Sequence, residues 1–128
     1  MSFSNFLETA VLGHVFGGTA YTQPTTVYVS LHTANPAEDA SGAEVTTVGT
    51  AYARQAGTFT VTGNTATTNA AVEFATATAS WGTITHVAVW DAASLGNMLA
   101  YAALTASKAI ASGDVFRIPT GDLDITLD

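Results

Sequence analysis

Apolar side chains near the N-terminus recur at the three- and four-residue spacing of an amphipathic helix. They would form one stripe consisting of Phe3, Phe6, Leu7, Ala10, Val11 and Val15. Ser4 is a suitable N-cap, and Asn5 followed by Glu8 has the form of a capping box. The glycine pair at 17–18 is a natural end. The pattern predicts a helix within residues 1–18 that either packs on the body of the protein or anchors it to a neighbour.

Most of the remaining chain alternates with the two-residue period of β-strands. In "TTVYVSLH", residues 25–32, the apolar side chains at 27, 29 and 31 share one face, and Tyr28, Ser30 and His32 share the other. Turn sequences such as "TGN", "SLGN" and "PTGD" separate the further runs "GTFTVTG", "AAVEFA", "THVAVWDA", "NMLAYAAL", "DVFRIP" and "LDITLD". About seven or eight short strands with regular turns predict a mainly β fold, an antiparallel sandwich or jelly-roll-like domain with a short N-terminal helix.

Residues 33–55 do not follow this alternation. They mix Pro, Gly, Asp, Glu and Ser before they reach Tyr52 and Arg54. Loops of this length in a compact domain are usually functional or mobile. We expect either an arm that lies on a partner or an exposed surface loop. No linker divides the chain, so residues 1–128 are expected to form one β domain with its core strands in 56–128.

The segment "WGTITHVAVWDAASLGNMLAYAAL", residues 81–104, contains polar side chains that raise the question of catalysis. His86 and Asp91 are five residues apart, which places them on opposite faces of a strand. Ser94 and Asn97 suit a turn, and the sequence around Ser94 does not form a G-x-S-x-G elbow. Both faces of the two strands are largely apolar, which is typical of a central hairpin. The segment is therefore interpreted as scaffold, and no catalytic residue or cofactor is predicted.

Composition narrows the classes of partner. Three basic residues stand against ten acidic ones, giving a formal net charge of -7. Binding to nucleic acid or to an anionic membrane needs clustered cations, so neither is expected. Charged residues make up only 10% of the chain, which suits a subunit whose surface meets other proteins. The N-terminus lacks the basic region of a signal peptide, so synthesis and folding in a cytoplasm are expected.

Candidate metal ligands are few. The three histidines do not have the spacing of a metal site, and cysteine is absent. Asp122, Asp124 and Asp128 cluster near the C-terminus but lack the remaining ligands of an EF-hand loop. A weak Ca²⁺ site shared with a neighbour is the only metal site that this cluster suggests, and no resident metal is predicted.

Several segments form a familiar pattern: "YVSLHTANP", "GAEV", "YARQAGTFT", the whole hairpin segment 81–104 with its continuation "TASKAIASGD", and the closing "FRIPTGDLDITLD". In these segments most of the chain resembles a family of small virion structural proteins from tailed bacteriophages. The resemblance implies a virion component made in the cytoplasm of a bacterial host, with no catalytic residues. Proteins of similar size and β-content act as capsid cement or decoration subunits, and members of this family are often labelled as tail-fibre or minor structural proteins.

Three functions remain open at this point. The preferred hypothesis is a capsid cement subunit, a dimer or trimer that binds the major capsid protein lattice or other virion proteins. The second is a tail-associated protein, either a fibre or baseplate module or an adaptor. The third is a carbohydrate-binding domain, with Tyr52, Trp81, Trp90 and Tyr101 as stacking platforms. The candidate partner-binding residues come from the helix and the 33–55 segment: Phe3, Phe6, Leu7, Val11, Asn35, Pro36, Tyr52 and Arg54.

Overall fold

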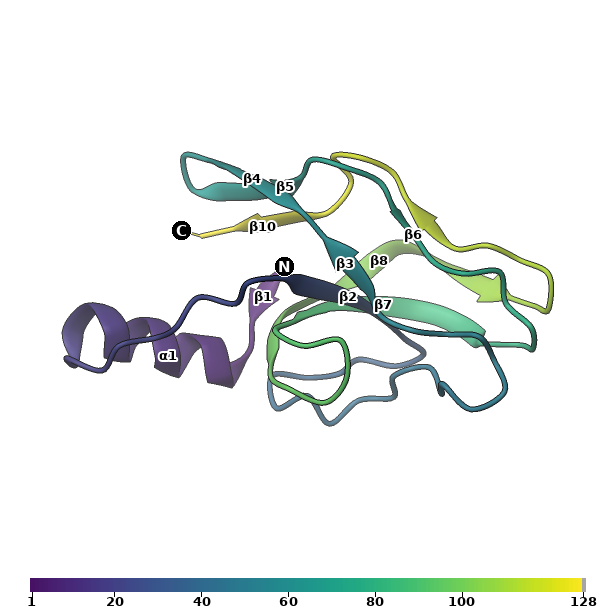
Figure 1. Ribbon diagram of the computed structural model, residues 1–128, viewed down its shortest axis with the longest axis horizontal. Coiled ribbons are helices and arrows are strands. Elements are labelled where there is room, and N and C mark those ends of the chain that lie inside the picture. The colour runs from purple at the N-terminus through teal and green to yellow at the C-terminus, as the bar shows by residue number, and fades with distance from the viewer. Residues whose placement is uncertain (128) are drawn as a thin grey trace.

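The computed structural model describes residues 1–127 and shows a mainly β, sandwich-like domain with one short N-terminal helix (Figure 1). All strand pairs are antiparallel. The predicted fold class, mainly β with antiparallel sheets and a short N-terminal helix, is therefore confirmed. The largest sheet has five strands in the order β1-β8-β7-β2-β3. Their bounds are β1 Ser2–Phe3, β8 Met98–Ile110, β7 Gly82–Trp90, β2 Val27–His32 and β3 Gln55–Gly57.

Two smaller sheets form the second layer. One has the order β10-β5-β4, and the other pairs β6 with β9. Figure 1 shows both above the large sheet, with the chain crossing between the layers after β3. Their bounds are β4 Phe59–Thr62, β5 Thr65–Thr68, β6 Val72–Glu73, β9 Arg117–Ile118 and β10 Asp124–Thr126.

The main core fills the space between the layers. Val29, Leu31, Ile84, Val87 and Val89 from β2 and β7 are fully or almost fully buried in it. Burial of each such side chain contributes about 1.5–3 kcal/mol. Packed aromatic rings extend the core, and their centroids lie 5.4–6.4 Å apart: Tyr52, Phe74, Trp81 and Phe116.

The predicted alternation of β2 is confirmed. Val29 and Leu31 face the main core, while Ser30 and His32 lie on the opposite face, where a second apolar cluster of Ala88, Trp90 and Met98 packs. Strict two-residue alternation along β7 would place Ile84 on the same face as His86, but the structure does not follow it there. A register shift between these two residues returns Ile84 to the core side.

The predicted hairpin 81–104 does lie centrally, since β7 has β8 on one side and β2 on the other. Strand β8 continues to Ile110, beyond the apolar run that predicted it. Three strands, β1, β3 and β5, were not predicted. β5 has the sequence "TATT" and is held in place by β4 on one side and β10 on the other.

Residues 33–54 form a long loop that packs back on the domain instead of an extended arm, and many of its residues stay exposed. Val45 N–H donates to Leu31 C=O at 3.0 Å and Thr33 N–H donates to Ala43 C=O at 3.0 Å, so this segment continues the edge beside β2. Pro36, Val45 and Thr50 are buried. These buried side chains therefore serve the domain's own core, while others in the segment, such as Val48, lie on the surface.

The helix α1 spans Asn5–Phe16 and lies within the predicted range. Ser4 is the N-cap, and its hydroxyl accepts from Leu7 N–H at 3.2 Å and donates to Met98 C=O. Phe3, which was assigned to the helical stripe, pairs with β8 as part of β1. No residue of α1 is buried, and the helix projects from the sandwich (Figure 1).

Candidate interaction surface

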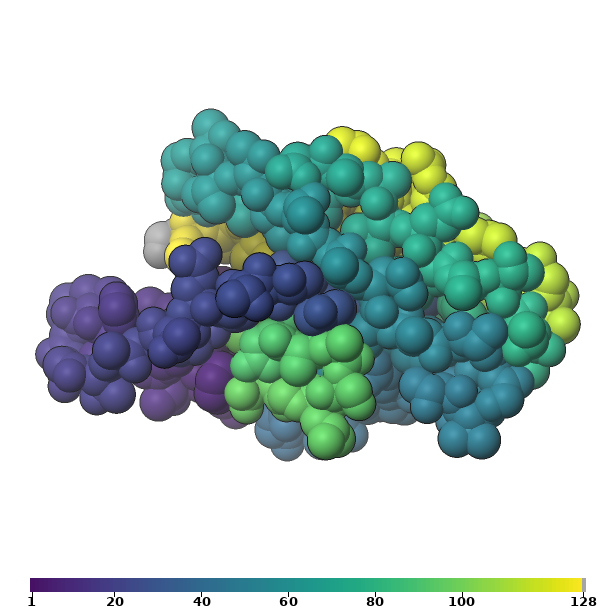
Figure 2. Space-filling view, in the orientation of Figure 1, coloured from purple at the N-terminus to yellow at the C-terminus, as the bar shows by residue number. Residues whose placement is uncertain are grey.

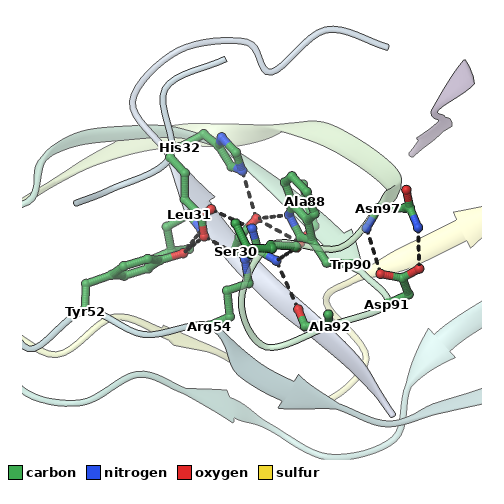
Figure 3. Close-up of polar contacts among 12 residues, drawn as sticks. Ser30, Leu31, His32, Tyr52, Arg54, Ala88, Trp90, Asp91, Ala92 and Asn97 are labelled. Atoms are coloured by element: carbon green, nitrogen blue, oxygen red, sulfur yellow. Dashed lines mark hydrogen bonds and ion pairs between the residues drawn. The ribbon is translucent and has the colours of Figure 1, made fainter. Parts of the chain in front are cut away.

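The side chain of Arg54, just before β3, is enclosed in a polar network inside the domain. Its Nε and Nη2 atoms donate to the Glu44 carboxylate at 2.9 and 2.8 Å, and Nη1 donates to the carbonyls of Ala92 and Leu95 at 3.0 and 2.8 Å. The guanidinium also lies 3.7 Å from the centroid of the Trp90 ring, and the Arg54 side chain is 7% exposed. Figure 3 shows Arg54 reaching Ala92 in the loop that follows β7. This network fastens the loop to the sheet.

Tyr52 completes the same network. Its hydroxyl donates to Glu44 at 2.7 Å and accepts from Leu31 N–H at 3.0 Å. Burial and the neighbouring carboxylate raise the pKa of Tyr52, so the phenol stays protonated and keeps donating. Burial alone would raise the pKa of Glu44, but hydrogen bonds from Arg54 and Tyr52 bring it below its usual range. The polar groups of Tyr52 and Arg54 are thus engaged within the domain.

Ser30 and His32 lie side by side on the face of β2 that points away from the main core. Ser30 Oγ and His32 Nε2 are 2.8 Å apart, and Trp90 Nε1 donates to Ser30 Oγ at 2.8 Å (Figure 3). Ser30 is 0% and His32 is 1% exposed, so no substrate reaches the hydroxyl. Burial also lowers the pKa of His32, which keeps the imidazole neutral. The pair therefore fills the second cluster and does not form an accessible nucleophile and base.

The polar residues of the β7–β8 hairpin have structural roles. The Asp91 carboxylate accepts from the backbone N–H of Asn97 at 2.7 Å and from its side-chain amide at 2.9 Å. Leu95 and Gly96 adopt positive φ angles of 56° and 74°, as a tight turn requires. His86 contacts the hydroxyl of its neighbour Thr85 at 2.8 Å. The predicted turn is confirmed, and Asp91 closes it.

Two other expectations find no site among residues 1–127. No three His, Cys, Asp or Glu side chains of this range converge on a metal position, Asp124 accepts from Thr67 at 2.6 Å, and Asp128 lies outside the described residues. The stacking platforms suggested for carbohydrate are enclosed, because Tyr52, Trp81 and Trp90 are 3–8% exposed. Of the four aromatic candidates, Tyr101 alone is half-buried.

The other candidate partner-binding residues fall into two places. Phe3, Leu7 and Val11 are half-buried along the N-terminal strand and helix, and Phe6 is 39% exposed with its ring against Tyr21 at 6.2 Å between centroids. Asn35 is exposed and Pro36 is buried at the start of the 33–54 segment. Asn35 Oδ1 accepts from Ala37 N–H at 2.9 Å and so forms a local turn.

An apolar groove opens between the two layers beside the helix, and its volume is about 650 Å³. Phe3 and Leu7 line it together with one end of strands β2, β3, β7 and β8, and the inner face of the β10-β5-β4 sheet forms its other wall. Figure 2 shows the C-terminal strand (yellow) recessed between the β4–β5 hairpin and the dark blue segment that returns from the helix to β2. The wall residues of the small sheet are Phe59, Val61, Ala66, Ile125 and Leu127.

The small sheet separates apolar from polar residues between its two faces. Its outer face bears a grid of hydroxyls with one carboxylate: Thr60, Thr62, Thr65, Thr67, Thr126 and Asp124. Its inner face is only partly covered, since Val61 is 70% and Leu127 is 51% exposed. The groove is therefore an apolar surface that the rest of the domain leaves open.

A second open apolar surface lies at the far end of α1. Leu12, Val15 and Phe16 are spaced i, i+3 and i+4, share one side of the helix, and are 59%, 60% and 81% exposed. The segment that returns after the helix packs on another side, where Tyr21 N–H donates to His14 Nδ1 at 3.1 Å. We refer to these three side chains as the helix patch. The apolar stripe predicted from the sequence contained Val15 but neither Leu12 nor Phe16, because the spacing alone does not show which apolar side chains of a helix stay exposed.

Residues 2–126 match the protein family Gp80, described as "Podophage GP4 fiber I protein gp80". The chain belongs to this family. It is therefore related to structural proteins of the phage virion, in agreement with the resemblance found in the sequence. No curated protein matches the chain. Within residues 1–127, no helix has the length and apolar character needed to cross a membrane.

Proposed function

We propose that the chain is a non-enzymatic structural module of the phage tail, most directly of a tail fibre. The observation that carries this proposal is the match of residues 2–126 to the Gp80 family, whose description names a fibre protein. That description favours the tail-associated alternative over the capsid cement hypothesis that the sequence first suggested. The virion is the place of action in either case.

The geometry supports a structural role. Two polar clusters resemble catalytic machinery, one around Arg54 and one around Ser30 and His32. Their polar atoms form hydrogen bonds within the domain. Two of the surfaces left open are apolar, namely the groove and the helix patch. Apolar patches rimmed by polar residues mark contacts with other macromolecules.

The partners proposed are other virion proteins. Nucleic acid is a poor partner, because Arg54 is enclosed in its ion pair and Arg117 lies 3.9 Å from the Glu73 carboxylate. Lys108 is then the one side-chain cation of residues 1–127 outside these pairs. A single cation neutralises too little phosphate charge for appreciable binding.

Location and copy number in purified virions test the proposal. Antibodies raised against the chain are coupled to gold and imaged on intact particles, and the amount of the chain is measured by gel densitometry against the major capsid protein. We expect label on the tail and a copy number far below that of the major capsid protein. Label spread over the head, with a copy number comparable to the capsid protein, would instead establish a cement subunit.

A further inference from the structure

Leu95, at the tip of the β7–β8 loop, is unfavourably placed in both its side chain and its backbone. The side chain is 84% exposed, the largest exposed fraction among the large apolar residues of 1–127. The backbone φ is 56°, in the left-handed region that glycine and asparagine adopt more easily than leucine does. A small polar residue would be more stable at this position. An outlier of this kind points to a role of the loop beyond folding.

The loop around Leu95 is held in place by hydrogen bonds within the chain. The Asp91 carboxylate closes it by accepting from the backbone and side-chain N–H groups of Asn97. Nη1 of Arg54 donates to the carbonyls of Ala92 and Leu95 itself. Because these bonds already order the loop, binding of a partner costs less conformational entropy than it would for a mobile loop. The network around Arg54 thus presents the leucine side chain in one position.

An open pocket of about 710 Å³ lies beside Leu95, and the Glu44 carboxylate forms part of its wall. Oε2 of Glu44 accepts from both Tyr52 and Arg54, whereas Oε1 accepts from Arg54 alone. Each carboxylate oxygen has two lone-pair sites, so Oε1 can accept one further hydrogen bond. The Glu44 side chain is 25% exposed, so this carboxylate is open to an incoming donor.

The surface around the loop is acidic. Glu38 and Asp39 line a hollow that meets the pocket at Gly96, and Glu44 borders the pocket itself. Arg54 is the one cation among the residues that line these two hollows, and its side chain is 7% exposed. A basic surface therefore complements this one. A second copy of the chain is a poor fit, because each copy carries a formal charge of -7.

We propose that Leu95 and the pocket beside it dock on a different virion protein, which offers an apolar pocket for Leu95 and a lysine or arginine for Glu44. This inference rests on the proposed structural role in the virion. Binding energy at interfaces is concentrated in a few well-packed anchor residues, and a preorganised exposed leucine suits that use. Figure 1 shows the β7–β8 loop on the side of the large sheet opposite the two smaller sheets, so this contact leaves the apolar groove open.

The test measures incorporation of variants into virions. A phage whose own gene for the chain is disrupted is grown in cells that supply each full-length variant, and copy number in purified particles is measured by gel densitometry. Leu95→Asn should lower the copy number at least about tenfold, because burial of one leucine is lost. Its melting temperature should equal or exceed that of the wild type, since asparagine tolerates the left-handed region. A structural role of Leu95 alone would not lower incorporation.

Val48→Asn is the matched control. Val48 is 83% exposed, and the neighbouring Gly49 carbonyl accepts from Thr78 near the start of β7, whereas Leu95 follows the end of that strand. We expect this variant to be incorporated like the wild type. The purified Leu95→Asn chain should also keep the wild-type mass in light scattering, because the contact is with a different protein.

A second pair of variants tests the charge of the partner. Asp39→Asn removes a carboxylate beside the loop, while its Oδ1 can still accept from Ser41 N–H. It should lower the copy number about two- to fivefold, the effect of one exposed ion pair. Asp122→Asn is the control, since Asp122 is exposed and lines neither hollow. It should be incorporated like the wild type.

Four results would overturn the proposal. They are wild-type incorporation of Leu95→Asn, an equal fall for Val48→Asn, equal incorporation of Asp39→Asn and Asp122→Asn, and a changed mass of purified Leu95→Asn. The last result would assign Leu95 to contacts between copies. Absence of the wild-type chain from virions would overturn both this proposal and the proposed function. Gold label on the head, with the expected order of the variants, would overturn the tail location alone.

Discussion

Replacing Arg54 by alanine removes four hydrogen bonds and the cation above the Trp90 ring in a single substitution. The Glu44 carboxylate then loses its ion pair while its side chain remains only 25% exposed. The carbonyls of Ala92 and Leu95, which hold the loop after β7, lose their donor as well.

The expected cost follows from the burial of the pair. Removal of one partner from a buried ion pair costs about 3–5 kcal/mol, because the remaining charge is left without compensation. Glu44 regains some water through its exposed edge, so we place the loss of unfolding free energy near the lower end, about 3 kcal/mol. For a domain of this size that corresponds to a fall in melting temperature of about 10 °C. Arg54→Lys keeps the charge but loses the planar fork, so its loss should be intermediate.

Urea unfolding followed by the fluorescence of the buried Trp81 and Trp90 measures the effect. Protein concentration is held fixed, since self-association also stabilises the folded state. Arg117→Ala is the matched control, because Arg117 and Glu73 form a pair whose side chains are 54% and 63% exposed. Its removal should change the unfolding free energy by no more than about 0.5 kcal/mol. A loss below about 1 kcal/mol for Arg54→Ala, or a loss equal to that of Arg117→Ala, would refute the structural role of the network.

Three further substitutions or conditions probe other parts of the fold. Burial lowers the pKa of His32, so as pH falls below about 6.5 the imidazole is protonated in the unfolded chain before it is protonated in the folded one. The unfolding free energy from urea titrations should therefore be lower at pH 5.5 than at pH 7.5. In His32→Gln this free energy should change less between the two pH values. Gly96→Ala should cost more than Gly63→Ala, since both have positive φ but only the first would place its Cβ 2.5 Å from Asp91 Oδ1; equal melting temperatures would contradict this. Ser4→Ala should lower the unfolding free energy by about 1–2 kcal/mol through loss of the N-cap, and an unchanged urea midpoint would show that the cap is dispensable.

An element could be predicted where the sequence pattern of its own segment agreed with the way it packs in the fold. The alternation of β2 and the helix N-cap at Ser4 are examples, because each depends on residues close in sequence. The side on which Ile84 lies could not be predicted, since a register shift in the pairing of β7 with β8 sets it. β5 carries only threonine and alanine, and its pairing on both edges makes it a strand.

Less of the candidate interaction surface than of the fold could be predicted from the sequence. Tyr52 and Arg54 looked like exposed members of an arm, but Glu44, eight and ten residues earlier, holds both within the domain. The groove is assembled from segments far apart in the chain, with Phe3 at one end of the sequence and Ile125 near the other. No spacing within a single segment reveals such a surface, because the fold creates it.

The hydroxyl grid on the outer face of the β10-β5-β4 sheet should make this face insensitive to ionic strength. Threonine hydroxyls hold water through neutral hydrogen bonds, and Asp124 is the only charged member of the grid. Attraction and repulsion between exposed charges fade within about 10 Å at 0.1 M salt, whereas neutral hydration is not screened in this way. The interactions of this face should therefore depend less on ionic strength than those of a charged surface would.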